Sequence, residues 1–415
     1  MFSITTLAKE AKEASKQIAN LSSETKTKAL KDMAIALRKS VNSIISENRK
    51  DLDRAKNNGL SEAMIDRLTL TENRIEDIAQ AIEQIANQPD PVGSVKHQYK
   101  LDNGLEVQKV SIPLGVIAMI YESRPNVTAD AAALCFKAGN AVILKGGKEA
   151  LNSNIAIGQI LHQALKQNRI SEGAIGIVSD PDREHMAELL TLNQFVDLII
   201  PRGGEGLIQY VSENSRIPVI QHYKGVCHLY IDKEADIEKA IDILINGKVQ
   251  RPGVCNALET LLLHKNLTET DIKKIVAALE ENQVTIHACE KTLPYFSNAK
   301  IANDSDYEAE YLTLEIACKQ VNSFEEAIKH IHQYSSDHTE VIVTENESRA
   351  NSFVKQINSS VVMVNASSRF SDGGQLGLGA EIGISTSKLH AYGPMGVESL
   401  TTEKFVVLGD GQIRE

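Results

Sequence analysis

From Gly115 onward, short apolar segments alternate with helical segments, and this alternation restricts the possible folds more than any other feature. The apolar segments are rich in β-branched residues and lie at 115–121, 141–145, 174–178, 196–200 and 219–221. Helices are expected between them, at 128–138, 149–167, 182–192 and 204–213. Strands that are apolar on both faces and joined by helices form a parallel sheet covered on both sides. The sequence therefore predicts an α/β protein with a doubly wound sheet.

A second alternating region follows residue 232 and predicts a second α/β unit. Its expected helices lie at 234–247, 268–282, 323–332 and 346–357. Its expected strands lie at 257–264, 284–289, 312–320, 340–345 and 359–365. A length of 415 residues agrees with two or three domains, because single cores rarely grow so large.

The first part of the chain differs from both regions. Residues 5–88 show only helical periodicity, and Ser22 and Thr71 are expected to cap two of the helices. A hairpin is expected at 97–112, because Asn103-Gly104 between two alternating runs strongly favours a tight turn.

Composition excludes several classes of protein. The formal net charge of −11 argues against nucleic-acid binding, which needs a basic surface. The longest apolar runs are too short to cross a bilayer, and the N-terminus does not read as a signal peptide. Five cysteines without a Cys-x-x-Cys pair do not form a disulfide framework, which favours the cytoplasm. The histidines are scattered, and His330 and His332 fall on different faces of a helix, so no metal site is expected.

Cys255 lies in a sequence that favours a reactive thiol. Pro252 and Gly253 precede it and predict a sharp loop between a helix and a strand. Such a loop can present a nucleophilic sulfur to a cleft. The alternative is a packing cysteine, the interpretation that we favour for Cys135 and Cys318.

Polar groups follow three strands of the first sheet, and the carboxyl ends of parallel strands face the ligand crevice. Arg124 and Asn126 follow the first strand, Lys145 and Lys148 flank two glycines at the second, and Arg202-Gly203-Gly204 opens a helix after another. Glycines at such positions free backbone N–H groups for an anion. Each segment is also compatible with a simple turn. The chain has neither a Gly-x-Gly-x-x-Gly fingerprint in the right context nor a P-loop.

Together these segments resemble the aldehyde dehydrogenase superfamily and, within it, the γ-glutamyl phosphate reductases. The resemblance rests on PLGVIAMIYESRPNVTADAAALCFKAGNAVILKGGKEA (113–150), PVIQHYKGVCHLYID (218–232), QRPGVCNALETLL (250–262) and NASSRFSDGGQLGLGAEIGISTSKLHAYGPMGVESLTTEK (365–404). It implies two doubly wound α/β domains and a small β oligomerisation element. The dinucleotide-binding domain would comprise 1–96, 113–231 and 376–391, the catalytic domain 232–375, and the oligomerisation element 97–112 and 392–415. A homo-oligomer is therefore expected.

The resemblance also implies an activity, the NADPH-dependent reduction of L-glutamyl 5-phosphate to L-glutamate 5-semialdehyde and phosphate in proline biosynthesis. Cys255 matches the nucleophile that forms a thioester. Asn126 matches the side chain that, with the backbone N–H of the cysteine, holds the oxyanion. Arg251 and the backbone N–H of Asn256 are expected to stabilise the thiolate. A separate glutamate 5-kinase would supply the substrate.

The cofactor residues follow in the same way. Lys145 matches the lysine that binds the adenosine ribose, Gly203 and Gly204 lie where the pyrophosphate passes, and Glu310 matches the glutamate that holds the nicotinamide ribose. We interpret Lys148 as the contact to the 2′-phosphate of NADPH. For substrate phosphate or carboxylate the candidates are Arg124, Arg202 and Arg251.

One position separates reductases from hydrolytic aldehyde dehydrogenases. Aligning Lys224-Gly225 with the family's glycine pair puts His222 where hydrolytic members carry a water-activating glutamate. This favours a reductase. The alternatives are that Glu259 acts as that base, that the chain oxidises an aldehyde to a free acid, or that it is a binding protein without catalysis. We expect Glu259 to point into packing, because it lies within a strand.

Overall fold

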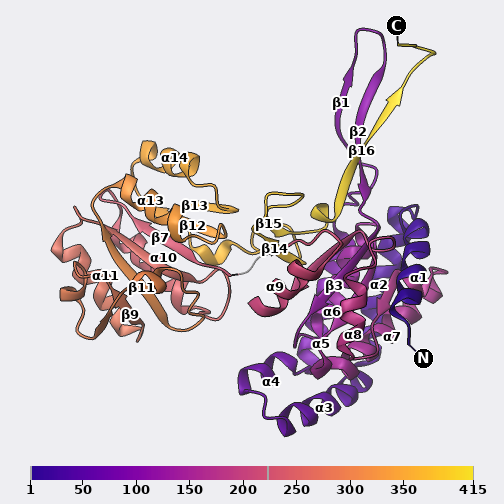
Figure 1. Cartoon of the computed structure of the whole chain (residues 1–415), viewed down its shortest axis with the longest axis horizontal. Helices are drawn as coiled ribbons and strands as arrows, with labels where there is room; N and C mark the ends of the chain where they lie inside the picture. Colours follow the sequence, from indigo (N-terminus) through magenta and orange to yellow (C-terminus); the bar gives the residue numbers. More distant parts are fainter. Residues whose placement is uncertain (1, 222–223, 415) are drawn as a thin grey trace. The chain divides into compact units, whose positions relative to one another are not determined.

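The computed structural model describes residues 2–221 and 224–414. They form two compact units, which are traced in Figure 1. Unit 1 comprises Met1–Gln221, Gly377–Gly383 and Met395–Glu415, and unit 2 comprises His222–Leu376 and Ile384–Pro394. Both are mixed α/β structures, so the predicted fold class is confirmed.

Unit 1 begins with the expected run of helices: α1 (Ile4–Ile18), α2 (Ser23–Lys39), α3 (Val41–Asn57), α4 (Glu62–Leu68) and α5 (Glu72–Asn87). The side chains of Ser22 and Thr71 accept the backbone N–H groups of Thr25 and Arg74 at the starts of α2 and α5. Both predicted caps are therefore confirmed.

A parallel four-stranded sheet follows, in the order β5-β4-β3-β6. Its strands are β3 (Val116–Tyr121), β4 (Ala141–Gly146), β5 (Ile175–Ile177) and β6 (Leu198–Arg202). The helices of this region are α6 (Asn126–Lys137), α7 (Leu151–Gln167), α8 (Arg183–Leu189) and α9 (Glu205–Asn214), with short 3-10 turns at η1 (Lys148–Ala150) and η2 (Glu172–Ala174). The predicted strand 219–221 contributes only an isolated bridge between Ile199 and Val219. The other predicted strands of this region are present.

The expected hairpin is also present and acquires a third strand. Strands β1 (Val95–Lys100) and β2 (Glu106–Pro113) pair antiparallel, and β16 (Thr401–Leu408) pairs with the other edge of β2. Gly104 in the turn has φ +89°, a conformation that favours glycine. Figure 1 shows these three strands as a ribbon that extends from unit 1, with the C-terminus near its tip.

Unit 2 contains a seven-stranded parallel sheet in the order β10-β9-β11-β8-β7-β12-β13. Its strands are β7 (Cys227–Ile231), β8 (Leu258–His264), β9 (Thr285–Ala288), β10 (Ala299–Ile301), β11 (Glu315–Val321), β12 (Thr339–Val343) and β13 (Val361–Val364). Its helices are α10 (Ile237–Val249), α11 (Glu269–Glu281), α12 (Asp304–Tyr307), α13 (Phe324–Tyr334) and α14 (Glu347–Gln356), with 3-10 turns at η3 (Leu293–Tyr295) and η4 (Ser368–Phe370). The short strands β14 (Gly383–Ser385) and β15 (Gly393–Met395) pair with each other, and η5 (Glu398–Leu400) precedes β16.

Two predicted domain boundaries differ from the units of the structure. We expected β7 to end the dinucleotide-binding domain, but β7 lies between β8 and β12 in the sheet of unit 2. Both of its hydrogen-bonding edges are used by strands of unit 2, so unit 2 starts before residue 232. Residues 384–391, which we also expected in the first domain, belong to unit 2 as well.

Apolar side chains cover both faces of the sheet of unit 2. One core cluster contains Leu229, Leu261 and Leu263 with residues of α10 and α11, and a second contains Tyr230 and Leu262 with residues of α13 and α14. Alternate residues of β7 and β8 thus point to opposite covered faces, as the two-sided apolar pattern predicted. Among the described residues, no helix has the length and apolar character needed to cross a membrane.

Candidate active site

The predicted site residues of unit 1 gather at the carboxyl edge of its sheet. In the register of the sheet, Tyr121 of β3 lies beside Gly146 of β4 on one side and Arg202 of β6 on the other. The three segments that follow these strands are therefore neighbours, as the sequence predicted. These segments carry Arg124 and Asn126, Lys148, and Gly203 and Gly204, and Lys145 lies at the end of β4 itself.

Lys145 is the most buried cation of this edge. Its residue is 8% exposed, and its Nζ donates to the backbone oxygen of Gly146 at 3.4 Å. Burial lowers the pKa of Lys145, although the carboxylates of Glu149, Asp180 and Asp182 act in the opposite direction. Lys148, in contrast, is exposed.

Asn126 is the first residue of α6, and its amide faces a carboxylate. Its Nδ2 donates to Oδ2 of Asp130, one turn further along, at 2.9 Å. Burial raises the pKa of Asp130 to about 6, and the bond from Asn126 and the charge of Arg202 limit that rise. Arg202 in turn lies 3.9 Å from Glu381. Arg124 is exposed.

In unit 2, Cys255 lies in the loop between α10 and β8, as predicted. The loop turns through a hydrogen bond from the N–H of Ala257 to the oxygen of Val254 at 3.0 Å. Cys255 is partly exposed, whereas Cys135 and Cys318 are buried, as we expected for packing cysteines. Burial raises the pKa of both buried thiols far above the ordinary value. The loop thus carries a more accessible thiol than the packed strands and helices do.

The backbone of Cys255 is packed closely against Gly225. A Cβ added at Gly225 would collide with the carbonyl group of Cys255. The N–H of Gly225 donates to Oε1 of Glu310 at 3.0 Å, and Sγ of Cys227 donates to the oxygen of Cys255 at 3.2 Å. Gly225 therefore contacts both Cys255 and Glu310, two residues that were predicted from separate motifs.

Glu259 forms a buried ion pair beside this loop. Its Oε2 lies 2.6 Å from Nζ of Lys248, and both side chains are fully buried. Its Oε1 accepts the N–H of Leu312, a residue with φ +56°, at 3.4 Å. Burial raises the pKa of Glu259 to about 7, opposed by Lys248. Glu259 points into packing, as we expected, while His222 lies outside the residues that the structure describes.

Comparison with known proteins agrees with this architecture. The aldehyde dehydrogenase family matches residues 3–307 of the chain. The γ-glutamyl phosphate reductase of Colwellia psychrerythraea is 57% identical over 415 residues, which are 100% of this chain and 99% of the relative. The same enzyme of Idiomarina loihiensis is 55% identical over 412 residues, covering 99% and 98%. The crystal structure of γ-glutamyl phosphate reductase from Thermotoga maritima has a TM-score of 0.98 at 42% identity, covering 100% of both chains.

The chain belongs to the aldehyde dehydrogenase family. Its resemblance to the γ-glutamyl phosphate reductases, inferred from four sequence segments, is confirmed by these relatives.

Within this aldehyde dehydrogenase fold, the structure reveals a carboxylate that sequence reasoning missed. Glu122 directly follows β3, and its Oε2 accepts the N–H of Gly204, the cap of α9, at 3.0 Å. The N–H of Glu122 donates to the oxygen of Arg202 at 3.1 Å, which fixes the two segments against each other. The helix N-terminus that we expected to hold a pyrophosphate thus holds a carboxylate. The sequence signal was an acid immediately after the strand.

Arg369 is the second missed residue. Its Nε donates to Oε1 of Gln250 at 3.0 Å, and another nitrogen of its guanidinium donates to Oδ1 of Asn256, the neighbour of Cys255. Burial and the charge of Arg251 lower the pKa of Arg369, whereas Asp372 and Cys255 raise it. Arg251 itself is exposed. Two guanidinium groups therefore lie near the loop, where sequence reasoning named only one.

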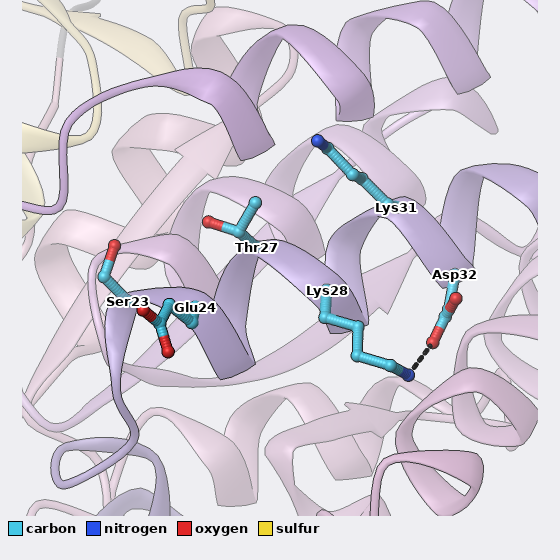
Figure 2. Close-up of a pocket in the computed structure, with 6 residues that line it drawn as sticks. All are labelled: Ser23, Glu24, Thr27, Lys28, Lys31 and Asp32. Carbon is cyan, nitrogen blue, oxygen red and sulfur yellow. Dashed lines mark hydrogen bonds and ion pairs between the residues drawn. The ribbon is translucent and has the colours of Figure 1, made fainter.

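A cavity of about 490 Å³ lies along α2 and does not coincide with these residues. Residues on successive turns of this helix line the cavity, as Figure 2 shows: Ser23, Glu24, Thr27, Lys28, Lys31 and Asp32. Lys28 and Asp32 form an ion pair. No predicted site residue is among them. A second cavity, of about 240 Å³, lies in unit 2 and is lined in part by Gln250 and Arg369. Within the described part of the chain, no group of three or more His, Cys, Asp or Glu side chains could hold a metal ion.

Proposed function

We propose that the chain reduces L-glutamyl 5-phosphate to L-glutamate 5-semialdehyde and phosphate with NADPH, in proline biosynthesis. The observation that carries the proposal is a partly exposed thiol, Cys255, on a loop held by Gly225 beside Glu310. The relatives named γ-glutamyl phosphate reductase supply the substrate class.

In this proposal Cys255 performs the covalent chemistry. Its thiolate attacks the acyl carbon of the acyl phosphate, the bond to the phosphate oxygen breaks, and inorganic phosphate leaves with the electron pair. The product of this step is a thioester on Cys255. After reduction, the tetrahedral oxyanion reforms a carbonyl and expels the thiolate, which releases the aldehyde. Asn126 and the backbone N–H of Cys255 are proposed to donate hydrogen bonds to the oxyanion.

The residues of unit 1 fit a dinucleotide. The N–H of Gly204 at the start of α9 already donates to an oxyanion, the carboxylate of Glu122, so this position suits a phosphate oxygen. Lys145 is proposed to bind the adenosine ribose, and the exposed Lys148 the 2′-phosphate of NADPH. In unit 2, Glu310, held by Gly225, is proposed to bind the nicotinamide ribose. When bound, the reduced nicotinamide supplies the hydride.

Arginines in both units favour an anionic substrate. Arg251 and Arg369 lie on unit 2, and Arg124 and Arg202 lie at the sheet edge of unit 1. We propose that members of this set bind the phosphate and the carboxylate of the substrate. Glu259 is held by Lys248 and is fully buried, which argues against its use as a water-activating base. The proposed fate of the thioester is therefore reduction, or exchange with phosphate in the reverse direction.

The test follows NADP reduction by absorbance in the reverse direction, with glutamate 5-semialdehyde in the presence and absence of phosphate. The proposal expects turnover that requires phosphate and that Cys255→Ala abolishes. Phosphate-independent turnover would instead assign the chain to the hydrolytic aldehyde dehydrogenases. Full turnover by the alanine variant would remove Cys255 from the mechanism.

We also propose that β1, β2 and β16 form a homo-oligomer interface. Alternate residues of a strand share a face, and Tyr99, Val107 and Val407 are neighbours on one face of this sheet. Tyr99 is 49%, Phe405 62% and Val407 53% exposed, which is unusual for side chains of this size. An exposed apolar row of this kind supports pairing with a second copy of the chain.

A further inference from the structure

The smaller cavity of unit 2 carries charges of both signs. It has a volume of about 240 Å³ and is lined by Asn246, Gln250, Arg369, Phe370, Asp372 and Gln375. The lining thus comprises one cation, one carboxylate, three side-chain amides and one aromatic ring. Such a set is complementary to a small ligand that itself carries both charges.

Contacts of Arg369 join this cavity to the Cys255 loop. The guanidinium bonds to the side chain of Gln250 on one side and to that of Asn256 on the other. Asn256 is only 5% exposed, and its Nδ2 donates to the oxygen of Ser371 at 2.9 Å. Its own backbone oxygen accepts the hydroxyl of Ser368 at 2.6 Å. The residue next to the thiol is therefore clamped by the segment that lines the cavity.

Asp372 has an orientation fixed by its own backbone turn. Its Oδ1 accepts the N–H groups of Gly374 at 2.9 Å and Gln375 at 3.3 Å. The residue is exposed and lines the same cavity as Arg369, and its charge raises the pKa of Arg369. A single phosphate dianion would meet this carboxylate as a repelling group, whereas a zwitterion would find a partner for each charge.

We propose that this cavity is the subsite for the α-amino-acid head group of the substrate, with Arg369 binding the α-carboxylate and Asp372 binding the α-ammonium group. The inference rests on the proposed function and deepens it, because it states how the enzyme selects a glutamyl substrate. In that substrate, two methylene groups separate the α-carbon of the head group from the reacting acyl carbon. A head group held beside Asn256 therefore directs the acyl arm along the loop that carries Cys255.

The experiment measures kcat/KM for three aldehydes in the reverse direction, at saturating phosphate and NADP. The aldehydes are glutamate 5-semialdehyde, 4-aminobutanal, which lacks the carboxylate, and 5-oxopentanoate, which lacks the ammonium group. The variants are Arg369→Gln and Asp372→Asn, and the control is Lys355→Gln, which removes an exposed cation of α14. The phosphate KM is measured for each variant as well.

Arg369→Gln is expected to lower kcat/KM about 10- to 100-fold for the two aldehydes that carry a carboxylate and to change 4-aminobutanal only slightly. Asp372→Asn is expected to act in the complementary way, with a loss for the two aldehydes that carry an amine and little change for 5-oxopentanoate. Lys355→Gln should behave like the wild-type enzyme.

Equal losses for all three aldehydes would overturn the subsite, because they would indicate a structural role for the clamp on Asn256. A raised KM for phosphate with unchanged discrimination between the aldehydes would overturn it in favour of a phosphate contact at Arg369. Should Arg369→Gln fail to fold, the isosteric Asp372→Asn decides alone. If the wild-type enzyme does not turn over glutamate 5-semialdehyde with phosphate, the proposed function fails, and the subsite fails with it.

Discussion

The side-chain amide of Asn126 donates a hydrogen bond of 2.9 Å to the carboxylate of Asp130, one turn further along α6. The amide proposed to stabilise the oxyanion is thus oriented by an acid whose pKa is raised to about 6. The positive charge of Arg202, a residue of β6, limits this rise in the pKa of Asp130. The ionisation of one partly buried carboxyl is therefore linked both to the stability of unit 1 and to the environment of Asn126.

Asp130→Asn is expected to stabilise the protein relative to wild type as the pH rises from about 4 to above 6. The folded-state pKa of Asp130 is raised above the ordinary 3.8, so its contribution to stability is fully present below that value and is lost as pH rises through about 6. The difference between these pKa values corresponds to at most roughly 3 kcal/mol. Urea denaturation at several pH values measures the difference in the free energy of unfolding between the variant and the wild type. Asp77→Asn, at an exposed position, is the control. A stability difference that does not vary with pH would contradict the linkage.

Glu259→Gln is expected to destabilise unit 2 by about 3–5 kcal/mol, because it leaves the charge of Lys248 buried without its partner. The exposed pair of Lys273 and Glu269 is the matched control, and Glu269→Gln should change the free energy of unfolding only slightly, because solvent screens this pair. Thermal or urea denaturation compares the two variants. Replacing both buried partners, as in Lys248→Met with Glu259→Leu, should recover much of the loss. A double variant as unstable as Glu259→Gln would be inconsistent with this explanation.

Gly225→Ala is expected to lower kcat at least about 100-fold while the protein stays folded, because the new Cβ would displace the backbone of Cys255. Gly253→Ala lies in the same loop, where the nearest atom to an added Cβ is the oxygen of Leu312 at 3.6 Å, an ordinary contact. That variant should keep most of the activity. Steady-state kinetics with circular dichroism as a check of folding measure the contrast, and equal activities would rule out the packing argument.

Glu122→Ala is expected to strengthen NADPH binding by about 3- to 10-fold, because a carboxylate that competes for the N–H of Gly204 is removed. Calorimetric titration of the unreacted enzyme measures the affinity directly. Glu205→Ala, which removes a charge from the first turn of the same helix without that hydrogen bond, is the control for long-range electrostatics. Weaker binding by the Glu122 variant would show instead that the carboxylate contributes to the cofactor site.

Phe405→Glu together with Val407→Glu is expected to convert the proposed oligomer to smaller species, because two charges would replace an apolar row. Thr402→Glu, on the opposite face of β16, is the control. Light scattering coupled to size-exclusion chromatography gives the mass of each. A wild-type protein that is monomeric at micromolar concentration would contradict the proposed interface.

The sequence by itself determined the elements and the loop that carries the thiol. Alternation of short apolar segments with helical segments predicted the strands of both sheets except β7 and β10. Asn103-Gly104 predicted the hairpin, and Pro252-Gly253 predicted the loop at Cys255, because each is a local preference of a few neighbouring residues. The rule that parallel strands end at one edge then brought the loops after β3, β4 and β6 together without a structure.

Only the tertiary structure decided which distant groups are partners. Three contacts join segments that are separated by tens to more than a hundred residues. Strand β7 lies between β8 and β12, Glu122 accepts the N–H of Gly204, and Arg369 donates to Asn256. Such contacts leave no local pattern, since one carboxylate or guanidinium fits many environments until the chain closes around it. For Glu259 both sources were needed. Its place in a strand predicted that the side chain is buried, but only the folded protein showed that Lys248 is the cation that pairs with the buried carboxylate.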